Sequence, residues 1–134
     1  MASIEAIEGI GAVYAIKLRE AGVRTVEKLL EVGATKKGRV ELAAATGISE
    51  KLILTWANHA DLFRIKGVSS QYSELLEAAG VDTVVELGNR KAENLHAKML
   101  EVNEKKKLVR RPPSLKMVES WVKQAGKLPR VMTY

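Results

Sequence analysis

The sequence contains no cysteine, which excludes disulfide bonds, thiolate zinc sites and a cysteine nucleophile. Aromatic residues make up only 4% of the chain, so a core has to be built from Ala, Leu, Val and Ile. The sequence also lacks a run of about 18 apolar residues, and no N-terminal apolar segment follows a basic one. We therefore expect no membrane-spanning helix and no secretion, and we expect the protein to be cytoplasmic.

Few residues interrupt regular structure. Only 3 prolines occur in a chain that is rich in Ala, Leu, Glu and Lys, which are strong helix formers. No stretch of useful length alternates β-branched and polar residues as a strand does. The composition therefore predicts an all-α protein, and 134 residues suffice for one compact domain or two small ones.

The opening part of the sequence recurs 58 positions later. The matching pairs include Gly9 and Gly67, Tyr14 and Tyr72, Leu18 and Leu76, Gly22 and Gly80, and Thr25 and Thr83. A later part recurs after 65 positions, where Ser49 matches Ser114, Trp56 matches Trp121 and Ala60 matches Ala125. The larger shift indicates an insertion in the second repeat, and the basic run 104–107 is its expected position.

The repeat predicts two tandem units, 1–64 and 65–134, each made of four short helices. The expected helices are 12–21, 25–31, 37–45 and 50–63 in the first unit, and 70–79, 84–87, 92–103 and 115–125 in the second. Four polar residues are expected to lie at helix N-termini: Thr25, Ser49, Thr83 and Ser114. Pro112 and Pro113 cannot continue a helix, which supports a new start at Ser114.

Apolar residues at helical spacing predict which helix faces are buried. On the first helix the apolar residues are Val13, Ile16 or Leu18, and Ala21. Trp56 and Trp121 each lie in the middle of an apolar stripe, which favours a role as core anchors. Stacking of these tryptophans on nucleobases is the alternative.

A Gly-hydrophobic-Gly turn, Gly9-Ile10-Gly11, comes directly before the first expected helix. Glycine can adopt positive φ and lets a backbone or a phosphate come close, so Gly11→Ala is expected to cost about 1 kcal/mol if Gly11 has positive φ. The helix that follows presents free N–H groups at its positive end, where an anion can bind. Gly22 is expected to close this helix in the left-handed conformation.

This stretch resembles the hairpin of the helix-hairpin-helix family, on six matching residues: Gly9, Ile10, Gly11, Ala15, Leu18 and Gly22. The resemblance implies sequence-independent binding of nucleic acid through hairpin amides and nearby Lys or Arg. The whole chain more closely resembles an uncharacterised bacterial and archaeal family of duplicated helix-hairpin-helix proteins, a domain of unknown function (DUF4332). That resemblance implies a fold of two SAM-like four-helix units and no settled activity.

The first hairpin is the better candidate for an anion site. The amides of Gly9, Ile10, Gly11 and Ala12 are expected to hold a phosphate. Basic side chains would extend the contact along the strand, namely Lys17, Arg24, Lys36, Lys37 and Arg39. On the alternative interpretation, the glycines only allow a tight turn and the charges only solvate a surface.

The second hairpin departs from the pattern. Ser69 replaces the second glycine, and no Lys or Arg occurs from residue 68 to residue 88. We therefore expect this hairpin to be structural or to face a protein. The C-terminal part is basic again and adds five candidate phosphate contacts, Lys105, Lys106, Lys107, Arg110 and Arg111. A solvated loop, or a surface for an acidic protein, is the alternative for this segment.

Catalytic motifs are missing from the sequence. It has no His-x-x-x-His pair, no phosphate-binding Gly-Lys-Ser/Thr loop and no nucleophile elbow, and His59 and His96 lie in different units. We therefore expect no enzyme activity, no metal and no cofactor. The helix-hairpin-helix resemblance and the basic clusters favour sequence-independent binding of nucleic acid, and we expect DNA in preference to RNA. A protein-interaction module with an acidic partner is the alternative, and no oligomeric state is predicted.

Overall fold

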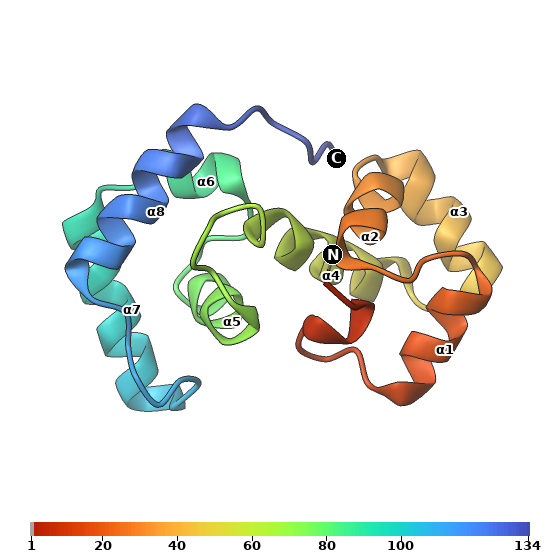
Figure 1. Ribbon diagram of the computed structural model, residues 1–134, viewed down its shortest axis with the longest axis horizontal. Coiled ribbons are helices and arrows are strands. Elements are labelled where there is room, and N and C mark those ends of the chain that lie inside the picture. The colour runs from red at the N-terminus through yellow and green to blue at the C-terminus, as the bar shows by residue number, and fades with distance from the viewer. Residues whose placement is uncertain (1) are drawn as a thin grey trace. The chain divides into compact units, whose positions relative to one another are not determined.

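The computed structural model describes residues 2–134. Over that range the protein has eight α-helices, one short 3-10 helix and no strand, which confirms the all-α prediction (Figure 1). The 3-10 helix is η1 (Ile4–Ala6), and the α-helices are α1 (Ala12–Glu20), α2 (Val26–Gly33), α3 (Lys36–Thr46), α4 (Glu50–Leu62), α5 (Ser70–Ala78), α6 (Val84–Gly88), α7 (Ala92–Lys106) and α8 (Leu115–Lys127). None of the helices in this range is long and apolar enough to cross a membrane.

The chain forms two compact units. The first runs to Asp61 and also includes Val131–Tyr134, and the second is Leu62–Arg130. The C-terminal residues were expected in the second unit. They lie on the first unit instead, where the Thr133 amide donates to the Ala34 carbonyl over 2.8 Å.

The predicted N-caps begin their helices as expected. The Thr25 hydroxyl accepts from the Lys28 amide at 3.0 Å, and the Ser114 hydroxyl accepts from the Met117 amide at 3.2 Å. Ser49 and Thr83 make the same contact at the starts of α4 and α6. Each such bond satisfies one of the amides that a helix start leaves without an acceptor.

Each unit has a tryptophan in its core, packed against a tyrosine. The ring centroids of Tyr14 and Trp56 lie 5.1 Å apart, and those of Tyr72 and Trp121 lie 5.3 Å apart. Both tryptophans are buried. This confirms their role as core anchors and leaves neither ring open for stacking on a base.

The buried face of α1 agrees with the expected one at Leu18, whereas the expected Val13 and Ala21 are exposed. Ala15 and Leu18 are buried, whereas Val13 is 66% exposed and Ile16 is 55% exposed. Leu18 is three positions after Ala15 and four after Tyr14, so these residues share one face of α1, on which Tyr14 packs against Trp56. The helical spacing then carries Val13 and Ile16 away from the core.

Candidate nucleic-acid interface

The turn before α1 depends on Gly9. Its φ is +95°, in the region that L side chains rarely adopt, and a Cβ on Gly9 would lie 3.4 Å from Trp56 Nε1. Ile10 is buried and ties the turn to the core. The turn therefore needs glycine at position 9.

Gly11 does not have positive φ, so the reason given for a cost of Gly11→Ala is wrong. Gly11 is the N-cap of α1 with φ −83° and ψ −175°, and nothing lies within 4 Å of the Cβ it would carry. Ser69, at the matching position before α5, has φ −88° and ψ 177°. The backbone at this position therefore accepts an ordinary residue.

The N-terminus of α1 is open to an anion in two respects. Gly11 makes no side-chain cap, and the first turn of α1 has no acidic residue. The exposed basic residues Lys17 and Arg24 lie at the other end of this helix, in its last turn and in the loop that follows, and Arg19 pairs with Glu5 at 2.5 Å. The uncapped amides at the start of α1 therefore suit a phosphate, without a basic side chain in the same turn.

Arg39 cannot serve as a surface phosphate contact, which corrects the sequence prediction. Its side chain is 2% exposed, and the guanidinium donates to the carbonyls of Gly33 at 2.8 Å and Thr133 at 2.9 Å. Arg39 thus binds the end of α2 and the C-terminal segment. Its neighbour Lys37 is exposed, and Lys36 forms an ion pair with Glu50.

The basic segment of the second unit forms a loop that side chains hold in place. Asn103, at the end of α7, donates to the Val109 carbonyl at 3.0 Å and accepts from the Val109 amide at 2.9 Å. The Tyr72 hydroxyl donates to the Arg111 carbonyl at 3.0 Å, and His96 Nε2 lies 2.9 Å from the Pro113 carbonyl. The loop after α7 is therefore anchored to both α5 and α7.

This anchoring brings cations to the second hairpin. Lys107 and Arg110 line a cavity of about 560 Å³ together with Gln71 in the first turn of α5. Gly67 has φ +97° in the turn before α5, as Gly9 has before α1. Sequence reasoning missed this arrangement because the cations lie far along the chain from the hairpin. The internal repeat and the inserted basic run were the only features of the sequence that could have indicated a basic loop near the second hairpin.

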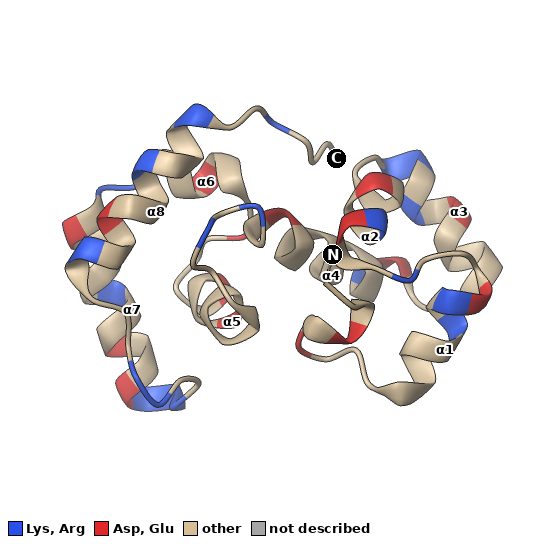
Figure 2. Ribbon diagram, viewed as in Figure 1, with Lys and Arg blue, Asp and Glu red and all other residues tan. Residues whose placement is uncertain are grey.

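The remaining basic candidates are spread along the helices and loops (Figure 2). Lys106 and Arg111 are exposed, and Lys105 lies 3.6 Å from Glu101 in an ion pair. In Figure 2, Lys and Arg mark the loop after α7 and several turns of α8. The described residues include no group of three or more His, Cys, Asp or Glu that could hold a metal ion.

The comparison with protein families covers both hairpins and both tryptophans. Residues 8–128 match the model of a family described as a domain of unknown function, DUF4332. The chain belongs to this family. No solved structure matches the chain. The DUF4332 match stops before the C-terminal residues 131–134, which pack on the first unit.

Proposed function

We propose that this protein binds nucleic acid without reading its sequence, by helix-hairpin-helix contacts to the phosphate backbone, with DNA preferred over RNA. The observation that carries the proposal is the basic loop that lies beside the first turn of α5. The loop supplies Lys107 and Arg110 to a hairpin whose own helix is acidic. A pair of cations beside a helix start is well suited to phosphate.

The first unit contributes in a different way. Its hairpin amides at 9–12, with Lys17, Arg24 and Lys37, would contact the backbone, and Lys36 could join them by leaving Glu50. Contacts of this kind position a protein on nucleic acid but carry no base information. Binding should therefore depend on salt and hardly at all on sequence.

The test compares two variants that remove the same charge. Lys107→Ala with Arg110→Ala removes the loop cations, and Lys123→Ala with Lys127→Ala removes two exposed lysines of α8. We expect the loop variant to weaken binding to duplex DNA by about tenfold and to reduce the log–log salt slope by about 2. The α8 variant should change both values much less. Equal effects in a fluorescence-anisotropy titration would contradict the assignment of the loop.

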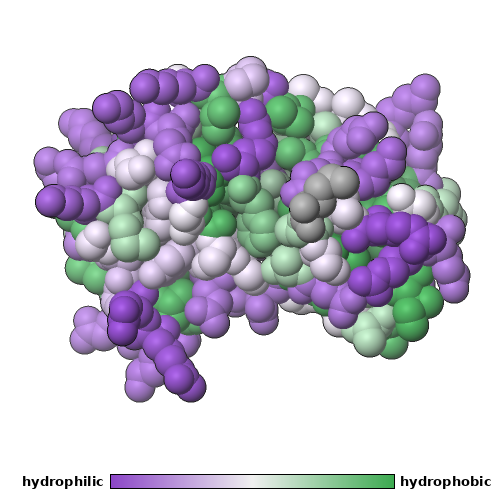
Figure 3. Space-filling view, in the orientation of Figure 1, coloured by the Kyte–Doolittle hydropathy of each residue, from purple (hydrophilic) through white to green (hydrophobic). Residues whose placement is uncertain are grey.

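The second candidate function is a protein-interaction module, which exposed apolar side chains on α1 favour. Val13 and Ile16 expose apolar side chains on α1, and Figure 3 shows apolar surface over this part of the first unit. A partner bound there should co-purify in stoichiometric amount and survive nuclease treatment. Val13→Ser with Ile16→Ser should release that partner and leave DNA binding unchanged.

A further inference from the structure

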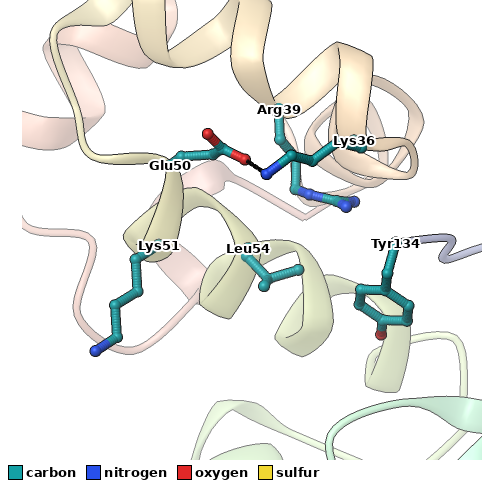
Figure 4. A pocket seen from close by; sticks show the side chains of 6 residues that line it. All are labelled: Lys36, Arg39, Glu50, Lys51, Leu54 and Tyr134. Carbon is teal, nitrogen blue, oxygen red and sulfur yellow. Dashed lines mark hydrogen bonds and ion pairs between the residues drawn. The ribbon is translucent and has the colours of Figure 1, made fainter.

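We propose that a pocket of the first unit binds a single unpaired nucleotide, with its base stacked on the ring of Tyr134. This inference rests on the proposed function and specifies a class of ligand for it, a single-stranded or unpaired segment. The pocket lies between the starts of α3 and α4 and the C-terminal residues (Figure 4). It is lined by Lys36, Arg39, Glu50, Lys51, Leu54 and Tyr134.

The pocket has the size and the chemistry of a nucleotide site. Its volume is about 480 Å³, within the range of about 300 to 1,000 Å³ that is usual for small-molecule sites. Three lining side chains are cationic and one, Glu50, is a carboxylate, so the net charge favours an anion. Leu54 and the Tyr134 ring offer apolar contact surface beside these charges (Figure 4).

The Tyr134 ring is held before any ligand arrives. Met132 is buried, and Thr133 bonds to Ala34 through its amide and to Arg39 through its carbonyl. The Tyr134 hydroxyl donates to Asn58 Oδ1 on α4 at 3.2 Å. A ring that is already ordered loses little conformational entropy when a base stacks on it.

Arg39 also fixes the ring by its position. The guanidinium carbon lies 5.5 Å from the Tyr134 ring centroid, which is a cation–π contact. The tyrosine nevertheless remains 61% exposed. The ring therefore combines one contact to a buried cation with a large accessible surface, as a stacking platform requires.

The phosphate of the nucleotide would lie at Lys36. Lys51 also lines the pocket, but its side chain points away from Lys36 and from the Tyr134 ring (Figure 4). Lys36 is paired with Glu50, so a phosphate would compete with that carboxylate. The Lys36 ammonium and the Tyr134 ring would then bind the phosphate and the base of one nucleotide.

An unpaired base is required because the bases of a duplex are already stacked on both faces. Aromatic side chains bind bases that are splayed out of a helix or lie in single strands. The pocket should therefore increase the affinity of the protein for single-stranded DNA but not for blunt duplex DNA.

The test uses the full chain with three variants at one position. Stacking is worth about 1 to 3 kcal/mol per base, so Tyr134→Ala should weaken binding to a labelled single-stranded 12-mer by about 5- to 150-fold. Tyr134→Phe keeps the ring and should stay within about twofold of the unaltered protein, whereas Tyr134→Leu keeps an apolar contact and should resemble Tyr134→Ala. Binding to a blunt duplex should be the same in all four proteins.

A second measurement needs no variant, in case a substitution loosens the C-terminal segment. A single strand that contains 5-iodouracil should form a photo-cross-link to Tyr134, mapped by mass spectrometry. Cross-links only at other residues would overturn the inference. So would a single-strand affinity that is unchanged by Tyr134→Ala while duplex binding persists, and the proposed function would then stand. Absence of binding to any DNA at low salt would instead remove both proposals.

Discussion

The two hairpins have the same backbone but obtain their cations differently. Gly9 and Gly67 both have positive φ, and a Cβ added to either would contact the indole nitrogen of a buried tryptophan. The first hairpin is followed by a helix that carries Lys17, and the second by a helix that carries Glu74 and Glu77. In the second unit the nearby cations come from the loop after α7.

The two hairpins share the packing of their turn on a tryptophan but differ in the charged residues near it. The glycine–tryptophan contact occurs in both units, so it belongs to the packing of the unit. The second glycine is replaced by Ser69 without change of backbone conformation, so it is not needed for packing. The charges can then be placed by a local helix or by a distant loop.

The largest expected effect tests whether the two cores are equivalent. Trp56→Ala and Trp121→Ala each remove a buried indole that packs on a tyrosine. Each should lower the free energy of unfolding by about 3 to 5 kcal/mol, because the cavity cannot fully collapse. Chemical denaturation followed by circular dichroism measures this. A cost below about 1 kcal/mol for either variant would show that its unit does not depend on this anchor.

The second-largest effect is expected for a substitution that releases the basic loop after α7. Asn103→Ala leaves the Val109 amide and carbonyl without their side-chain partners, which should cost about 1 to 3 kcal/mol. The loop should also become more mobile, so trypsin should cleave it faster at Lys107 and Arg110. We expect DNA binding to weaken although every Lys and Arg is retained. Unchanged proteolysis would mean that Asn103 does not hold the loop.

Substitutions of the hairpin glycines should lower the free energy of unfolding by less than the preceding variants, and by amounts that can be ranked. A Cβ on Gly67 would lie 3.1 Å from Trp121 Nε1, closer than the 3.4 Å between Gly9 and Trp56. Gly67→Ala should therefore cost at least as much as Gly9→Ala, with both above about 1 kcal/mol. Gly11→Ser copies Ser69 and should stabilise by a few tenths of a kcal/mol, as an added N-cap does. Thermal unfolding of the three variants gives the order, and a cost for Gly11→Ser would break the correspondence of the hairpins.

The sequence predicted the features that local signals determine. Helix starts at Thr25 and Ser114 follow from side-chain capping, and the two tryptophans follow from apolar spacing. The glycine turn at Gly9 was predicted on the same grounds. These features depend on residues within a few positions of one another.

The sequence did not predict the features that depend on distant contacts. Arg39 is buried because its guanidinium binds Thr133, which lies 94 residues away. The placement of the basic loop depends on Tyr72 and Arg111, which are 39 residues apart. Val13 was placed in the core, with Ile16 as an alternative to Leu18, because the apolar pattern of α1 permits more than one buried face.

Binding to the nucleic-acid backbone is the function that we propose for this protein. The most direct measurement is a fluorescence-anisotropy titration of labelled blunt duplex DNA at salt concentrations from about 50 to 200 mM. For about five phosphate contacts, we expect a log–log slope of about −4 to −5. A slope near zero, or no binding at the lowest salt, would contradict it.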